Sequence, residues 1–246
     1  PTTSVPGADG TAASFFGNDL LRSQATLSLP TSKTTTVLWF KTTCEDCGLF
    51  SRTQGVYPEQ TAHDLDLYLA DGNVCVRLNS TSSLPELRCS TDTDYADGEW
   101  HHLVHSLGAT DGNNLYINGA LAVGSPTTSA TIAGINAVAV GYSAIAGMPF
   151  LTGTLDNVVI YDAELSAAAA ANLYRAWQPA MLHADGTWSF DVPDGLEGQY
   201  QIDMRAVDSL GNRLDTRGDW AQFRGPIDSA APRFDALDHV APGAGG

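Results

Sequence analysis

The densest group of metal-ligating side chains in the sequence is the run His101, His102 and His105. The run lies in residues 100–107, where apolar residues alternate with polar ones, a pattern that predicts a β-strand. His102 then shares one face with Trp100, and only His101 and His105 share the other face. Those two are about 13 Å apart by the rise of a strand, too far for one metal ion. We therefore expect core and sheet-surface histidines.

The second chemically suggestive group is the four cysteines, Cys44, Cys47, Cys75 and Cys89, all within 46 residues. An even count in one strand-rich region favours two disulfides and an oxidising compartment. A zinc site is the alternative, but Cys75 and Cys89 do not form the second short knuckle that it needs. We favour Cys75–Cys89 as a cross-strand bridge and Cys44–Cys47 as a local clip. The other two pairings stay open.

Charge narrows the classes of partner. The 246 residues carry 12 Lys and Arg against 28 Asp and Glu, a net charge of -16. Such a surface repels nucleic acid and anionic membranes, and it suits a secreted protein or one that binds cations. Because the acidic residues are dispersed, a solvated surface is the simpler interpretation. No apolar run approaches the roughly 20 residues that span a bilayer, so we expect no membrane insertion.

The elements that would position these residues are almost all strands. Strand patterns occur at 14–16, 34–41, 66–69, 74–78, 87–90, 100–107 and 115–117. Tight hairpin turns are predicted at Asp71-Gly72 and Asn118-Gly119. The one convincing helix is 167–175, with Ser166 as N-cap and Leu165 as a hydrophobic staple. The fold class is all-β, with residues 1–13 as a linker or leading edge and 228–246 as a linker tail.

Three motifs in order point to a family. They are Asp97-Gly-Glu-Trp-His-His-Leu-Val, Leu115-Tyr-Ile-Asn-Gly, and the run from Gly153 to Ser166. Residues 14–177 resemble a laminin-G-like or pentraxin-like domain of the concanavalin A-like lectin/glucanase superfamily. The resemblance implies a jelly-roll sandwich of two antiparallel sheets with one short helix. We expect Trp39 and Trp100 to anchor the space between the sheets.

The resemblance implies binding at a surface rather than catalysis. Some relatives are glycosidases with a Glu-x-Asp-x-Glu strand, whose carboxyl groups lie about 5 Å apart. Here the pairs Asp64 with Asp66 and Asp92 with Asp94 lack glutamate partners. We therefore expect no enzyme and name no catalytic residue.

The resemblance also implies a structural calcium ion as a possible cofactor. Calcium prefers six to eight oxygen ligands. The related strand Gly-x-x-Asp-x-Val offers Asp156, and the opening turn offers Asn18 and Asp19 as partners. The alternative is that Asp156 satisfies backbone donors and that Asp19 caps a turn.

The character of the sequence changes after Trp177. Three strand patterns, 187–192, 199–207 and 220–224, give residues 178–227 a resemblance to the late strands of a bacterial immunoglobulin-like domain. Three strands are too few for a complete sandwich of about seven. They either pack on the jelly roll or complete a domain into which the jelly roll is inserted.

We expect a mature segment of a longer secreted or cell-surface bacterial protein. Its partners would be a glycan or a surface protein, together with neighbouring domains of the longer chain. The alternative is a structural spacer that binds nothing. An exposed aromatic side chain on a sheet face would favour the glycan.

Overall fold

The computed structural model describes residues 1–8, 11–23, 27–54, 62–79, 85–91, 94–125, 132, 134–145, 147, 149–175, 181–183, 185–189, 197–204 and 221–228. The chain divides into two compact units, with Pro1–Pro179 in the first and Ala180–Arg205 in the second. No helix among the described residues is long and apolar enough to cross a membrane.

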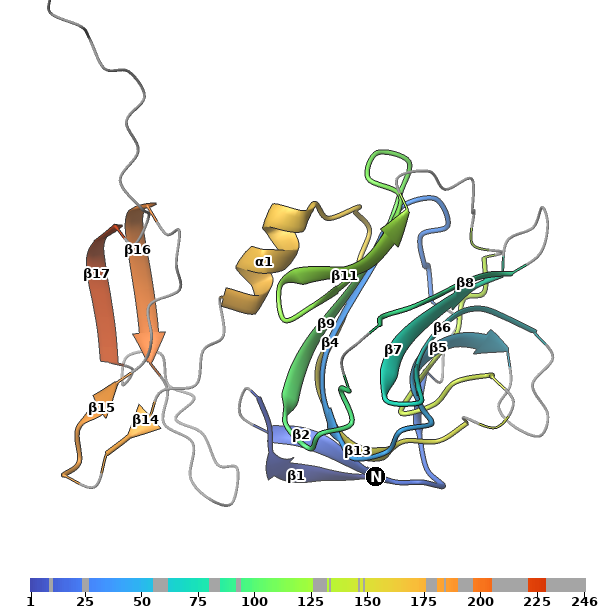
Figure 1. Cartoon of the computed structure of the whole chain (residues 1–246), viewed down its shortest axis with the longest axis horizontal. Coiled ribbons are helices and arrows are strands. Elements are labelled where there is room, and N and C mark those ends of the chain that lie inside the picture. Colours follow the sequence, from blue (N-terminus) through green and yellow to red (C-terminus); the bar gives the residue numbers. More distant parts are fainter. Residues whose placement is uncertain are drawn as a thin grey trace, which may run out of the picture. The chain divides into compact units, whose positions relative to one another are not determined.

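The first unit consists of two antiparallel sheets, and the predicted sandwich is confirmed (Figure 1). The seven-stranded sheet runs in the order β1 (Thr2–Pro6), β2 (Thr11–Phe16), β13 (Thr152–Tyr161), β4 (Thr34–Thr42), β9 (Trp100–Leu107), β10 (Asn113–Ile117) and β11 (Ala120–Ser125). The six-stranded sheet runs in the order β3 (Leu21–Arg22), β12 (Val138–Val140), β5 (Cys47–Gln54), β6 (Ala62–Ala70), β7 (Asn73–Leu78) and β8 (Glu86–Cys89).

The predicted turns close two of the hairpins. Asp71 and Gly72 have φ of 49° and 72°, and Asn118 and Gly119 have φ of 51° and 78°. Two successive residues with positive φ make the tight turn whose twist matches that of paired strands. The Asp71 turn joins β6 to β7, and the Asn118 turn joins β10 to β11.

The core lies between the two sheets and is strongly apolar. Alternate residues of each strand point inward, so one sheet contributes Leu38, Phe40 and Leu103, and the other contributes Leu67 and Val76. All five side chains are buried. Burying such side chains is the main free-energy gain of the fold, at about 25 cal/mol per Å² of apolar surface.

The helix α1 (Ala167–Arg175) covers part of the outer face of the seven-stranded sheet. Its bounds and its cap are as predicted, because the Ser166 hydroxyl accepts a hydrogen bond from the Ala169 amide at 3.3 Å. The Thr35 and Ser106 hydroxyls both accept from the Leu165 amide, at 3.2 and 2.9 Å, and thereby hold the helix entrance on the sheet.

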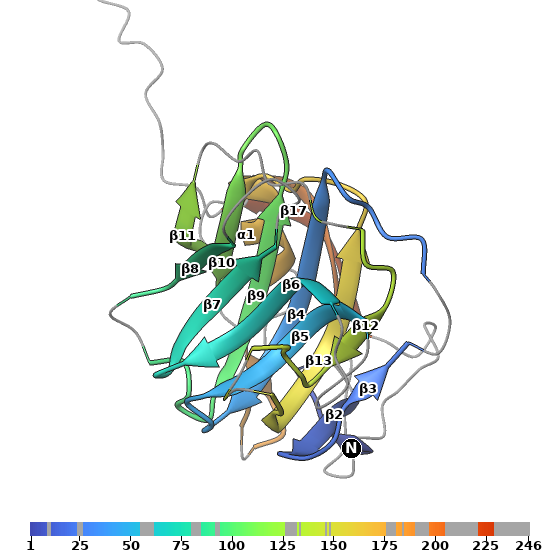
Figure 2. The ribbon, with the colours of Figure 1, turned by 90° about the vertical axis from the view of Figure 1, so that its right-hand side faces the viewer.

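A loop segment covers part of the outer face of the six-stranded sheet, which is turned toward the viewer in Figure 2. Asp64 Oδ2 accepts hydrogen bonds from the Gly134 and Ile135 amides at 2.9 and 2.8 Å. The same segment crosses Gly48 so closely that a Cβ there would lie 2.0 Å from the Ser143 nitrogen. The buried carboxylates of β6 therefore tie this segment down.

The prediction that Trp39 and Trp100 lie between the two sheets is wrong. Leu103 faces the core, and Trp100, three residues before it on β9, is out of phase with it and therefore faces outward. Trp39 pairs with His102 and packs against its ring, with centroids 4.8 Å apart, and against Tyr174 of α1. Both tryptophans thus lie on the outer face of the seven-stranded sheet, because Leu38 and Phe40 take the inward positions.

The chain's first residues form the edge of this sheet rather than a linker. Strand β1 pairs with β2, with Thr2 opposite Ser14 and Pro6 opposite Thr11. Their β-branched threonines and valine suit a strand, and Pro6, which has no backbone N–H to donate, ends an edge strand.

The second unit consists of two small sheets among the described residues. Strand β14 (Met181–Leu182) pairs with β15 (Trp188–Ser189), and β16 (Glu197–Met204) pairs with β17 (Ala221–Asp228). Within the part of the chain that the structure describes, these four strands pair only with one another. The immunoglobulin-like interpretation of residues 178–227 stays a prediction. The predicted tail after Asp228 lies outside the described residues.

Candidate ligand-binding face

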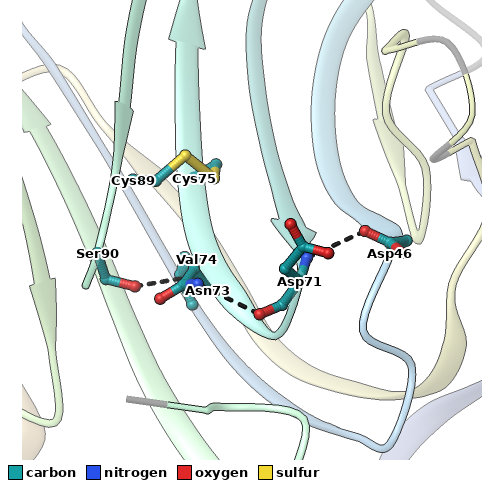
Figure 3. The surroundings of a disulfide bond; sticks show 7 residues. All are labelled: Asp46, Asp71, Asn73, Val74, Cys75, Cys89 and Ser90. Carbon is teal, nitrogen blue, oxygen red and sulfur yellow. Dashed lines mark hydrogen bonds between the residues drawn. A yellow bond between two sulfur atoms is a disulfide. The ribbon is translucent and has the colours of Figure 1, made fainter. Parts of the chain in front are cut away.

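One predicted disulfide is confirmed and the other is not. Cys75 and Cys89 are bonded across β7 and β8 (Figure 3). Cys44 and Cys47 are free thiols, which corrects the predicted clip. The Cys47 side chain points into the core, and its thiol donates to the Cys44 carbonyl at 3.3 Å. Burial raises the pKa of Cys47, so it stays a neutral thiol.

The candidate calcium ligands lie at different places on the sheet. Asp156 is buried on β13, opposite Trp39, and its Oδ1 accepts from the Asn157 amide at 2.8 Å. Asp19 follows β2; its Oδ1 accepts from the Phe16 amide at 2.8 Å, and its Oδ2 pairs with the Pro1 amino group. Phe16 pairs with Thr152, four residues from Asp156, which is about 13 Å along the strand.

Two further observations bear on these ligands. Asn18 is exposed. Among the described residues, no three His, Cys, Asp or Glu side chains lie close enough together to hold one metal ion. Calcium therefore stays a prediction, and the turn-capping role of Asp19 is realised in the structure.

The histidine run divides between the two faces as predicted. His101 Nε2 lies 3.0 Å from Asp97 Oδ1, and His105 Nε2 lies 2.9 Å from Asn113 Oδ1. Each histidine therefore has a separate partner, and the two rings share none.

The carboxylates of Asp64 and Asp66 on β6 are buried, and both accept hydrogen bonds from the protein. Asp66 Oδ1 accepts from the Ser51 hydroxyl at 2.7 Å and from the Ala144 amide at 2.8 Å, and Oδ2 contacts His63 Nδ1. Asp64 accepts two loop amides and lies 3.2 Å from Arg52 Nε in a buried ion pair. Neither carboxylate is accessible to a substrate, since both side chains are fully buried.

One region on the outer face of the seven-stranded sheet is not covered by any element that the structure describes. We call it the open face and define it by six outward side chains at the end of the sheet away from the helix entrance. Register pairs place them side by side: Ser14 opposite Thr154, Thr154 opposite Lys41, Lys41 opposite Trp100, and Phe16 opposite Thr152. In Figure 1 the strands β1 and β2 lie at this end, and α1 lies over the other.

The chemistry of the open face is aromatic and hydroxylic. Phe16 is 62% exposed and Trp100 is half-buried. The strands that carry them, β2 and β9, are three strand spacings apart in the sheet. This is about 14 Å, the length of a short oligosaccharide. Within the described part of the chain, the side chains of Ser14, Lys41, Thr152 and Thr154 have no protein hydrogen-bond partner. Aromatic rings stack on the apolar faces of sugars, and free hydroxyl and ammonium groups bind sugar hydroxyls.

The alternation of residues along the strands predicts outward aromatic side chains on this face. Phe15 and Phe16 are adjacent in one strand, so only one of them can face the core, and the other must face outward. Trp100 is likewise out of phase with the core residues Leu103 and Leu107. Alternation alone therefore indicates two outward aromatics on the same sheet.

Solved structures with the same fold include modules that bind ligands. The chain matches the carbohydrate-binding module (CBM40) of the Ruminococcus gnavus IT-sialidase, bound to α2,3-sialyllactose, with a TM-score of 0.51 and 18% identity over 66% of this chain and 97% of that one. It also matches domain 4 of a Geobacillus stearothermophilus extracellular arabinanase, in complex with arabinotriose, with a TM-score of 0.53 and 21% identity over 71% and 82%.

A third match is the binding domain of the Paraclostridial Mosquitocidal Protein 1, with a TM-score of 0.52 and 12% identity over 81% of this chain and 58% of that one. No curated protein sequence matches this chain. A family model, Laminin_G_3, matches residues 16–171, more than half of the chain. Its motifs and its two-sheet sandwich agree with that match, and the chain belongs to the concanavalin A-like lectin/glucanases superfamily.

Proposed function

We propose that this chain is a non-catalytic carbohydrate-binding module of a larger secreted or cell-surface protein, and that it binds glycan on the open face. The observation that carries the proposal is that the exposed Phe16 and the half-buried Trp100 lie on one sheet face, with hydroxyl groups between them that have no partner among the described residues. Exposed aromatic side chains placed among polar groups are typical of sites for sugars.

The matched structures support the class of ligand. Two of them are modules in complex with sialyllactose and arabinotriose, and both belong to extracellular or glycan-degrading enzymes by their names. Asp64 and Asp66 are buried and accept hydrogen bonds from the protein itself, so they are not accessible to a substrate. This supports a binding role for this chain too.

A glycan array tests the proposal. The full chain is applied to printed neutral oligosaccharides in the presence and in the absence of calcium. We expect signal for a subset of neutral glycans. Signal that requires calcium would support the proposed calcium site at Asp156, Asp19 and Asn18. A blank array under both conditions would contradict glycan binding and favour the structural spacer.

Substitution of Phe16 locates the binding face. We expect Phe16→Ala to weaken binding of the best array ligand about fivefold, because a stacked ring is lost. The measurement is isothermal titration calorimetry. Leu121→Ala is the matched control, since Leu121 is 58% exposed on the outer face of the same sheet but lies on β11. Equal affinities for both variants would place the ligand elsewhere.

A further inference from the structure

A second group of polar side chains lies on the outer face of the six-stranded sheet. One row across four strands contains Ser51, Asp66, Arg77 and Leu87, each opposite the next in register. Tyr68 lies two residues after Asp66 on β6, on the same face, opposite Cys75. This row is on the other sheet from the open face, so the inference does not depend on the proposed function.

A chain of hydrogen bonds fixes Arg77 in place. Arg77 Nη1 lies 3.4 Å from His63 Nε2, and His63 Nδ1 contacts Asp66 Oδ2. Because a guanidinium only donates, Nε2 is the acceptor and Nδ1 carries the proton that is donated to Asp66. Asp66 is therefore committed to His63, Ser51 and the Ala144 amide, and does not pair with Arg77.

The remaining donors of Arg77 have no partner among the described residues. Within the described residues, His63 is its one hydrogen-bond partner, and no carboxylate pairs with it. A guanidinium has five N–H donors in a planar fork that matches a carboxylate with two parallel hydrogen bonds. Arg77 is half-buried, so part of its side chain is accessible at the outer face of the sheet.

Two neighbours complete the site. Tyr68 is buried, and its hydroxyl has no hydrogen-bond partner in the described part of the chain. Burial and the negative charge of Asp66 raise the pKa of Tyr68, so the phenol stays protonated and can donate. Leu87 is 59% exposed on the edge strand β8 and offers an apolar shelf beside Arg77.

The floor of the site is rigid. The Cys75–Cys89 bond joins the two strands that carry Arg77 and Leu87 (Figure 3). The Ser90 hydroxyl accepts from the Val74 amide at 3.0 Å and braces the same pair of strands. A braced strand pair holds the guanidinium and the shelf at a fixed separation, which lowers the entropy lost on binding.

We propose that Arg77, Tyr68 and Leu87 form a second ligand site, which binds the carboxylate group of an acidic sugar. Arg77 takes the carboxylate in two parallel hydrogen bonds, the Tyr68 hydroxyl donates a third, and the C–H face of the ring rests on Leu87. A single guanidinium neutralises one negative charge. A phosphate dianion is disfavoured, because the chain's net charge of -16 repels it more strongly.

The test is a titration with glucuronate, followed by two-dimensional amide NMR, with glucose as the neutral comparison. We expect glucuronate to shift amide signals of β7 and β8, and glucose to leave them unchanged. Arg77→Gln should weaken glucuronate binding about tenfold or more, and Tyr68→Phe by a smaller factor, because each removes hydrogen bonds to a charged group. Added salt should weaken binding as well.

Arg88→Gln is the matched control, because Arg88 lies on the adjacent strand and is paired with Glu86 Oε1 at 2.6 Å. Phe16→Ala should leave glucuronate binding intact, which separates this site from the open face. The proposal is overturned if wild-type protein responds equally to glucose and glucuronate. Equal weakening by Arg77→Gln and Arg88→Gln would also overturn it, since only general charge would then be involved.

Discussion

Two buried histidines have a marked electrostatic effect at the scale of single residues. His102 packs against the rings of Trp39 and Tyr174, with centroids 4.8 and 6.0 Å away, and its Nδ1 has no hydrogen-bond partner among the described residues. His105 is fully buried in the core. Burial lowers the pKa of each to about 4. Both are therefore neutral in the folded protein at neutral pH.

This burial makes the fold sensitive to acid. The unfolded chain binds a proton at each histidine below its ordinary pKa of 6.5, whereas the folded chain does so only near 4. Stability is therefore fully present above pH 6.5 and falls as the pH drops toward 4. At pH 5 each histidine should cost about 2 kcal/mol of unfolding free energy.

His102→Phe tests this effect, since phenylalanine keeps a ring against Trp39 and Tyr174 but cannot be protonated. We expect a smaller loss of stability between pH 7 and pH 5 than in wild-type protein. The measurement is urea unfolding at both pH values. His183→Gln is the control, because His183 is exposed in the second unit. Identical pH dependence in all three proteins would contradict the assignment.

At the scale of elements, the edge strand β8 depends on its disulfide. It spans only Glu86–Cys89, and among the described strands it pairs with β7 alone, so few hydrogen bonds hold it. The bond closes a loop with a sequence separation of 14, for which about 3 kcal/mol of stabilisation is expected. The strand and the Leu87 shelf are thus held by one covalent link.

Removal of this link should lower the melting temperature. We expect Cys75→Ala with Cys89→Ala to melt several degrees lower, and wild-type protein in reductant to behave likewise. Thiol titration of the denatured, unreduced chain should find two thiols, Cys44 and Cys47. Finding none would show that these two cysteines are also bonded. Cys44→Ala is the control: it keeps the Cys75–Cys89 bond, so it should melt like wild-type protein without reductant and lose the same several degrees with it.

Elements with strong local patterns were predictable, and their outward faces were less so. The Asp71-Gly72 hairpin and the helix bounds follow from turn chemistry and capping, which act within a few residues. The location of Trp39 does not follow from local sequence. A buried tryptophan in a strand gives the same local pattern whether a helix or the other sheet covers it. The bond between Asp66 and the distant Ala144 amide likewise joins residues 78 positions apart.

At the scale of the molecule, the open face and the Arg77 site occupy different sheets of one sandwich. Each sheet's outer face is partly covered, one by α1 and the other by the segment that Asp64 and Asp66 hold. The two proposed sites lie on parts of these faces that no described element covers. Since they are on different sheets, their affinities can be measured independently.

The position of β13 in its sheet determines when the first unit can fold during synthesis. Strand β13 lies between β2 and β4, although it follows them by more than a hundred residues. On the ribosome, β2 and β4 have no common neighbour until residue 161 has emerged. Contacts of such long sequence separation slow folding, and they leave strand edges exposed meanwhile. We therefore expect the sheet to close late in synthesis, in one step that joins the start of the unit to its end.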